Sequence, residues 1–133
     1  MRIQAIDSVV DERQTVITFT DNTTSAFNWS GTITKDTMID AGLFDGDENH
    51  WIKSPASVKI GTAVTVIGEY AFGYAFDMSS VTIPDSVTSI GDSAFFNCGL
   101  TSVTIIDNGL HNLKTIGDYA FQDCSNLTYI TLP

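Results

Sequence analysis

The sequence predicts a repeat solenoid, mainly β with short helical turns, preceded by a small N-terminal cap that contains a β-hairpin. Three observations lead to this fold class. A hexapeptide of the type Ile-Gly-acid-x-Ala-Phe occurs three times, apolar and polar residues alternate in a short segment after each copy, and the first part of the chain lacks the motif. A single unit of this length cannot cover its own apolar face, so neighbouring units are expected to stack on one another.

The repeat has three parts that return in the same order. The Ile-Gly hexapeptides occupy residues 67–72, 90–95 and 116–121; short segments precede them at 64–66, 87–89 and 113–115, and strand-like segments follow them at 78–83, 100–105 and 127–132. In the second strand-like segment, Val103 and Ile105 alternate with Thr104, which predicts a short strand with the two apolar side chains inward. The additional residues of the last unit include Asp107-Asn108-Gly109, a turn signal where insertions are tolerated.

Stacking at strand spacing aligns equivalent residues into ladders. We expect Phe72, Phe95 and Phe121 to lie over one another in the core, and likewise Gly68, Gly91 and Gly117. The residues after each Ile-Gly pair are interpreted as a short helical turn, with Asp92 or Asp118 capping its free N–H groups.

The second unit carries a family resemblance. Its sequence Ile83-Pro84-Asp85-Ser86-Val87-Thr88-Ser89-Ile90-Gly91-Asp92-Ser93-Ala94-Phe95-Phe96-Asn97-Cys98 resembles the BspA-type (Treponema-type) leucine-rich repeat, and the resemblance extends over roughly residues 58–133. It implies a right-handed, curved solenoid of about three units with a parallel sheet on the concave side. It also implies a non-catalytic surface or secreted protein of bacteria that binds other proteins, and it supplies no catalytic residues. The chain departs from the pattern at Gly99 and in the insertion at 107–111, which affects local ladder geometry only.

Residues 1–57 do not match the repeat and are predicted to form an N-terminal capping or attachment module. Segments 17–20 and 26–29 flank Asp21-Asn22-Thr23-Thr24-Ser25, which predicts a β-hairpin with Ile17, Phe19, Phe27 and Trp29 on one face. Asp36 is placed to cap a short helix that includes Met38 and Ile39 and stops at Gly42. Such a module normally seals the exposed face of a terminal repeat.

Composition narrows the function classes. The chain has 133 residues, of which 16 are acidic and 6 basic, giving a formal charge of −10. This excess disfavours nucleic-acid binding and docking to anionic membranes, and no apolar run is long enough to span a bilayer. No Gly-x-Ser-x-Gly elbow or glycine-rich phosphate loop occurs, so we expect neither enzyme activity nor a cofactor.

Three groups of residues have both a chemical and a purely structural interpretation. Cys98 and Cys124 occupy the same repeat position; we interpret them as two buried thiols, with a disulfide as the alternative. The segment Asp45-Gly46-Asp47-Glu48-Asn49 resembles the start of a calcium loop but lacks the expected Gly and bidentate Glu, which favours a solvated acidic loop. Glu69, Asp92 and Asp118 form an acidic ladder, for which capping is favoured over a cation site, and His50 and His111 show no zinc-ligand spacing.

The candidate ligand-binding surface is the polar side of the predicted concave sheet. It is rich in hydroxyl groups with one aromatic residue, and its members are Thr82, Thr101, Ser102, Thr104, Thr128, Tyr129 and Thr131. Such a face suits a glycan or an extended polypeptide, although Thr also simply favours exposed strand positions. Tyr70, Tyr74 and Tyr119 are expected to lie off this face and are weaker candidates.

Two functions remain. The first is a protein- or glycan-binding module of a bacterial cell-surface or secreted protein, with a role in adhesion or host interaction. The alternative is a structural spacer or attachment component of a phage tail or another assembly, located in the virion. Because the sequence stops where the next Pro-Asp-Ser turn would begin, we also expect self-association through an uncapped C-terminal end.

Overall fold

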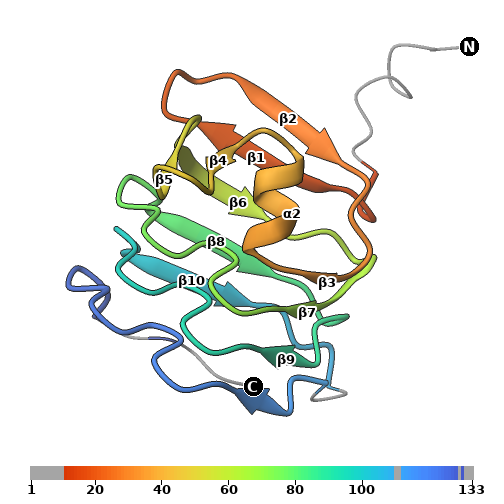
Figure 1. Ribbon diagram of the computed structural model, residues 1–133. Helices are drawn as coiled ribbons and strands as arrows, with labels where there is room; N and C mark the ends of the chain where they lie inside the picture. The colour runs from red at the N-terminus through yellow and green to blue at the C-terminus, as the bar shows by residue number, and fades with distance from the viewer. Residues whose placement is uncertain (1–10, 110–111, 129, 131–133) are drawn as a thin grey trace, which may run out of the picture.

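The computed structural model describes residues 11–109, 112–128 and 130, which form a stack of short strands joined by tight turns (Figure 1). Two sheets run along the stack: a five-stranded sheet in the order β10-β8-β6-β1-β2 and a four-stranded sheet in the order β11-β9-β7-β3. A two-stranded pair, β4-β5, and one short helix, α2, complete the described elements. Their bounds are β1 Thr15–Phe19, β2 Thr24–Phe27, β3 Gly31–Ile33, α2 Lys35–Asp40, β4 Phe44–Asp45, β5 His50–Trp51, β6 Pro55–Lys59, β7 Val64–Ile67, β8 Ser80–Ile83, β9 Ser89–Ile90, β10 Ser102–Ile105 and β11 Thr115–Ile116.

The repeats pair in parallel and in the predicted register. In the five-stranded sheet, Val81 of β8 lies opposite Val103 of β10, and Thr82 lies opposite Thr104. In the four-stranded sheet, Ser89 of β9 lies between Val66 of β7 and Thr115 of β11. Val81 and Val103 are buried whereas Thr104 is exposed, as the alternating pattern predicts. Half of the strand-like segment 127–132, namely residues 129, 131 and 132, lies outside the described residues.

The first part of the chain contributes strands to both sheets. The predicted hairpin is confirmed: β1 and β2 pair antiparallel, and β1 then pairs antiparallel with β6. Strand β3 pairs in parallel with β7. On the hairpin, Ile17 and Phe19 are buried, and Phe27 and Trp29 stack with ring centroids 4.3 Å apart. Because β6 spans the boundary predicted between 57 and 58, the division into a cap at 1–57 and repeats at 58–133 stays a prediction.

The predicted cap of the short helix is wrong by two residues. Helix α2 has Thr34 as its N-cap, and the Thr34 N–H donates a hydrogen bond to the Thr37 hydroxyl at 3.0 Å. Asp36 lies inside the first turn instead. A Thr at the N-cap position, with a hydroxyl acceptor three residues later, satisfies the same free backbone groups that a capping carboxylate would. After the C-cap Ala41, Gly42 adopts a left-handed conformation with φ of +77°.

The core contains the predicted ladder of phenylalanines. The Phe72 and Phe95 rings stack with centroids 5.6 Å apart, and the Phe95 and Phe121 rings with centroids 5.2 Å apart. Trp51 adds an unpredicted fourth member, 6.3 Å from Phe72 and nearly parallel to it. The three Ile-Gly glycines also align, since a Cβ placed on Gly91 would lie 3.0 Å from the carbonyl carbon of Gly68.

The segments after the Ile-Gly pairs are not helical, which corrects the predicted short helical turns. They are successive tight turns in which a residue with positive φ recurs every four positions, as at Ser93 (56°) and Asn97 (57°). Between these residues the backbone N–H groups donate to the neighbouring unit; Phe72 N–H, for example, donates to Ala94 O at 2.8 Å. Hydrogen bonds between units therefore replace the bonds that a helical turn would form within itself.

The predicted capping role of Asp92 is also corrected. Its carboxylate accepts the backbone N–H of Asp118, one unit further along, at 2.8 Å. The acid therefore links two units, because stacking brings the next unit's free N–H closer than those of its own turn. In the acidic loop, the Asp45 carboxylate accepts the N–H groups of Asp47 and Glu48 and so stabilises a turn. Within the described part of the chain, no group of three or more His, Cys, Asp or Glu side chains is arranged to hold a metal ion.

The two cysteines are buried free thiols, as predicted. Each donates a hydrogen bond to the preceding unit, Cys98 to Phe72 O at 2.9 Å and Cys124 to Phe95 O at 3.0 Å. A hydrogen bond with Cys124, together with burial, raises the pKa of the Cys98 thiol. The thiol of Cys98 is therefore protonated at neutral pH and acts as a core group.

Among the helices formed by the described residues, none has the length and apolar character needed to cross a membrane.

Candidate functional site

The outer face of the five-stranded sheet carries a continuous row of hydroxyl side chains. Strand register places one hydroxyl residue on every strand, each opposite the next: Ser102, Ser80, Ser57, Thr18 and Thr24. At the spacing of neighbouring strands, five members extend over about 19 Å. The residues between them along the strands, such as Ile17 and Val81, are buried, so the row lies on the side of the sheet away from the core.

A second row runs beside the first. It consists of Thr104, Thr82, Lys59, Val16 and Ala26, again in register across five strands. Between the rows lies a shallow groove of about 230 Å³, whose lining includes Thr18, Ser57, Lys59, Ser80 and Thr82. Lys59 forms an ion pair with Glu12 at 2.8 Å at one side of the groove. We call this surface the hydroxyl face; it comprises the two rows.

The structure brings some of the predicted site residues together and separates others. Thr82, Ser102 and Thr104 lie on the hydroxyl face. Thr101 precedes β10, and its hydroxyl donates to Ser79 O at 3.1 Å, so this group links two units. Thr128 is exposed beyond the described strands. Tyr129 and Thr131 lie outside the described residues.

Sequence reasoning missed the half of the hydroxyl face that comes from the first part of the chain. Thr18 lies between the buried Ile17 and Phe19, and Ser57 precedes the buried Val58. The same alternation that placed Thr104 outward was therefore present at both positions. At Thr18 it was not used because β1 lacks the repeat pattern. At Ser57 a local signal was present, since Ser57-Val58-Lys59-Ile60 repeats the Ser-Val-Thr-Ile pattern of residues 80–83 and 102–105, but the resemblance was taken to begin at residue 58.

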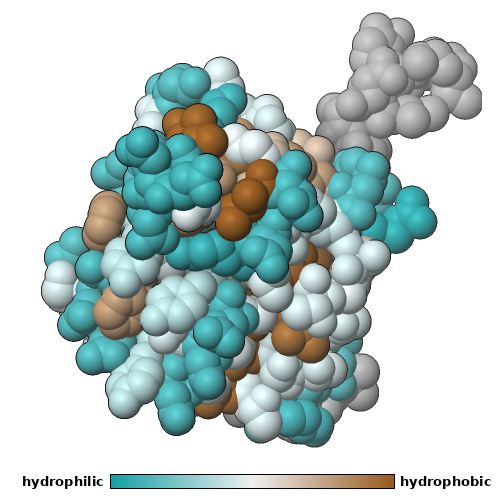
Figure 2. Space-filling model, in the orientation of Figure 1, coloured by the Kyte–Doolittle hydropathy of each residue, from teal (hydrophilic) through white to brown (hydrophobic). Residues whose placement is uncertain are grey.

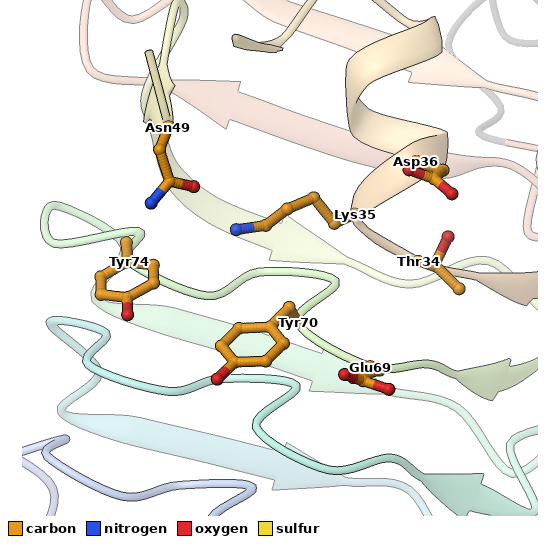
Figure 3. Close-up of a pocket in the computed structure, with 7 residues that line it drawn as sticks. All are labelled: Thr34, Lys35, Asp36, Asn49, Glu69, Tyr70 and Tyr74. Carbon is orange, nitrogen blue, oxygen red and sulfur yellow. The ribbon is translucent and has the colours of Figure 1, made fainter. Parts of the chain in front are cut away.

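A second hollow lies at the start of α2 and is larger, with a volume of about 580 Å³. Figure 3 shows Lys35 extending across it from the start of the helix, above the rings of Tyr70 and Tyr74 and toward Asn49. Asp36 and Glu69 line its other end. Tyr70 and Tyr74 were expected from the sequence to be weaker candidates for ligand contact, and Lys35 was not singled out.

Lys35 is held by aromatic rings. Its ammonium nitrogen lies 4.1 Å from the ring centroid of Phe44 and 5.3 Å from those of both Tyr70 and Tyr74. Burial lowers the pKa of Lys35 from its ordinary value, because an ammonium in a partly apolar setting loses hydration. The attraction between a cation and the faces of the rings offsets part of that loss.

Residues on the viewer's side of the molecule are mostly hydrophilic, and the hydrophobic ones form separate small patches (Figure 2). The aromatic side chains that recur from unit to unit, Phe72, Phe95 and Phe121, stack within the core.

The sequence matches a known family model: that of the BspA type leucine rich repeat region, over residues 37–133 and in six copies. The chain belongs to the BspA-type leucine-rich repeat family. The match begins earlier than residue 58, where the resemblance was expected to start, and it includes the end of α2 and strands β4 to β6.

Two solved structures are similar to this leucine-rich repeat chain. A leucine-rich repeat protein from Eubacterium ventriosum is 28% identical over 74% of the chain, with a TM-score of 0.52. A leucine rich cell surface protein from Faecalibacterium prausnitzii is 32% identical over 92% of the chain, with a TM-score of 0.46. The chain covers 24% and 29% of those two proteins, so it spans about a quarter of the length of each. No curated protein matches the chain.

Proposed function

We propose that this chain is a non-catalytic binding module of a bacterial cell-surface or secreted protein, and that the hydroxyl face is its contact surface. One observation carries the proposal: the hairpin strands β1 and β2, which lack the repeat pattern, place Thr18 and Thr24 in the same row as the serines of the repeat strands β6, β8 and β10. A requirement for solubility alone would be met by any polar residues at these positions.

The chemistry of the face suits an extended polar ligand, a protein segment or a glycan. Serine and threonine hydroxyls both donate and accept hydrogen bonds, so a row of them can pair with a ligand that presents both kinds of group at regular spacing. In this proposal the units stack as a right-handed solenoid whose parallel sheet is the concave side, and the shallow groove between the rows receives the ligand. Membership of the BspA-type repeat family supports a role in recognition at a cell surface.

The proposal is tested by measuring adhesion of the fluorescently labelled chain to fixed bacterial cells and to cultured epithelial cells. The test variant carries Thr82→Asp and Thr104→Asp, which place two carboxylates side by side on neighbouring strands of the hydroxyl face. We expect at least a tenfold loss of cell binding, because the new charges desolvate poorly and repel each other at a contact surface. Treating the cells with protease or with periodate distinguishes a protein receptor from a glycan.

The matched control carries Thr65→Asp and Thr115→Asp, which also lie on exposed strand positions but in the four-stranded sheet. The control is expected to bind cells like the parent chain. Equal binding by parent, test and control variants would remove the hydroxyl face as the contact surface and favour the role of a rigid spacer in an assembly.

A further inference from the structure

The hollow beside Lys35 adjoins a second one. The second hollow has a volume of about 310 Å³, and Asn49 and Tyr74 line both. His50, Phe76 and Asp77 line its far end. The larger hollow is within the size range of ligand pockets. We call the combined feature the Tyr74 trough.

Three aromatic rings follow one another along this trough. The Tyr70 and Tyr74 rings are nearly parallel, at an interplanar angle of 9°, with centroids 6.4 Å apart. The Phe76 ring follows at 6.2 Å from Tyr74, and 63% of the Phe76 residue is exposed. Phe96 from the next unit contacts both tyrosines edge-on, at 6.3 Å and 5.4 Å, and so fixes their planes. The trough therefore presents two nearly parallel tyrosine rings whose orientation is set before any ligand arrives, followed by the exposed Phe76 ring, which is inclined by 67° to that of Tyr74.

The backbone that carries these rings is strained. Tyr70 has φ of 55° and Tyr74 has φ of 64°, a left-handed conformation that is unfavourable for bulky residues. At the position of Tyr74, the following units carry Asn97 and Asp123, residue types that tolerate this conformation. A tyrosine at this position is therefore less favourable for the turn than Asn or Asp, which is expected where the ring has a role outside the fold.

The polar groups of the trough offer both donors and acceptors. Lys35 is a donor, and within the described part of the chain its ammonium makes no ion pair. Asp36 and Glu69 are acceptors when ionised, and the Asn49 amide is both. The carboxylates around the trough and the charge of −10 oppose an anionic ligand, while Lys35 already occupies the cation position over the rings. A neutral ligand with many hydroxyl groups satisfies donors and acceptors together.

We propose that the Tyr74 trough binds a neutral oligosaccharide. In this arrangement the apolar C–H faces of pyranose rings pack on Phe76 and on the parts of the Tyr70 and Tyr74 rings that Lys35 and Phe96 leave open. The sugar hydroxyls donate to Asp36 and Glu69 and accept from Lys35. The trough and the hydroxyl face share none of the residues named for either, so this inference stands independently of the proposed contact surface.

Isothermal titration calorimetry with the whole chain tests the proposal. The probes are gluco-, manno-, galacto-, xylo- and N-acetylglucosamine oligosaccharides of five to six residues, with oligogalacturonate as an anionic comparison. We expect at least one neutral probe to bind and oligogalacturonate to bind more weakly. Tyr74→Ala is expected to weaken binding of that probe by about tenfold or more, because it removes the ring shared by both parts of the trough.

Tyr119→Ala is the matched control. Tyr119 occupies the same repeat position as Tyr70, two units further along the chain, has φ of 62° and is 65% exposed, but lines neither part of the trough. It should bind the probe like the parent chain. Lys35→Met keeps the apolar stem and removes the donor, and is expected to weaken binding by several-fold.

Three results would overturn the inference: no neutral probe binds at millimolar concentration, oligogalacturonate binds best, or Tyr74→Ala and Tyr119→Ala change affinity equally. A Thr82→Asp/Thr104→Asp chain serves as a further control, since it alters only the hydroxyl face. If this variant loses cell adhesion but keeps oligosaccharide affinity, both sites are supported separately. If it loses the oligosaccharide as well, the ligand lies on the hydroxyl face and the trough proposal fails.

Discussion

The first part of the chain and the repeat units build the same ladders by different local means. Between residues 55 and 124, the repeat strands lie in parallel register, β6, β8 and β10 in the larger sheet and β7, β9 and β11 in the smaller one, and three phenylalanines form the ring stack. Between residues 11 and 51, the hairpin joins the larger sheet antiparallel, β3 joins the smaller sheet in parallel, and Trp51 extends the ring stack. The ladders therefore continue without a break where the sequence pattern changes.

The difference shows what the ladders require. Backbone pairing fixes only the register of a strand, whereas burial decides which side chain faces the core. Along the smaller sheet, equivalent isoleucines Ile33, Ile67 and Ile90 are no more than 1% exposed, but Ile116 is 40% exposed. Ile33 lies on the edge strand β3 and is buried all the same, so an edge position in the sheet does not by itself expose the isoleucine; Ile116 on the opposite edge strand lacks comparable cover among the described residues.

The largest effect is expected from removing a ring in the middle of the stack. Phe95 is fully buried between Phe72 and Phe121, so Phe95→Ala leaves a cavity and should lower the free energy of unfolding by about 3–5 kcal/mol. Phe121 has one stacked neighbour among the described residues and is only partly buried, so Phe121→Ala should cost about half as much. Urea titrations of both variants measure the difference. Equal losses would show that the end of the stack is as well covered as its middle.

A smaller loss of stability is expected at the contact between the end of β6 and residues 12–15, where the two regions meet; we call this contact the seam. Gly61 follows β6, its N–H donates to the Thr15 hydroxyl at 3.0 Å, and a Cβ there would overlap the backbone carbonyl of Arg13. Gly61→Ala should therefore cost about 1–3 kcal/mol through forced separation of the strands.

Gly46→Ala provides the comparison for that substitution. A Cβ at Gly46 meets only the end of the Ile39 side chain, at 3.0 Å, and this side chain can move. We expect a change below about 1 kcal/mol, again measured in urea. A Gly61→Ala protein as stable as the parent would mean that the seam is loosely packed.

Much of the repeat architecture could be predicted from the sequence, because ladders follow from repetition alone. The Phe72–Phe95–Phe121 stack, the aligned glycines and the Val81–Val103 register needed only the period and the alternation of residues. The hairpin at residues 15–27 followed from its turn signal. The tight turns after Ile-Gly did not, because the left-handed residues Tyr70 and Ser93 donate their backbone N–H groups to the following unit, at Asp92 O and Asp118 O.

The candidate sites divide in the same way. Thr82, Ser102 and Thr104 were placed on one face by local alternation. Ser57 lies in a segment that repeats their Ser-Val-x-Ile pattern, whereas Thr18 joins that face only through pairing of β1 with β6, which no local pattern encodes. Lys35 was missed for the same reason, since Phe44 comes to it from one segment and Tyr70 and Tyr74 from another.

The corrected cap of α2 offers a third test within the first region. Thr37→Val keeps the shape of the side chain but removes the hydroxyl that accepts the Thr34 N–H, and should cost about 0.5–2 kcal/mol. Asp36→Ala, at the residue first predicted as the cap, should change the free energy of unfolding by less than about 0.5 kcal/mol. Urea titrations compare the two. A larger loss for Asp36→Ala would return the capping role to the carboxylate.

The smallest effect concerns charge at the seam. Lys59 of β6 and Glu12 form an ion pair at 2.8 Å that joins the two regions, but their side chains are 44% and 65% exposed. Water and salt screen such a pair, so Lys59→Met should cost less than about 1 kcal/mol, and the difference from the parent should shrink further in 1 M NaCl. The backbone bonds beside it, such as Thr62 N–H to Glu12 O at 2.9 Å, remain in the variant. If Lys59→Met instead unfolds as readily as Phe95→Ala, the two regions are held together by charge and not by continuity of their ladders.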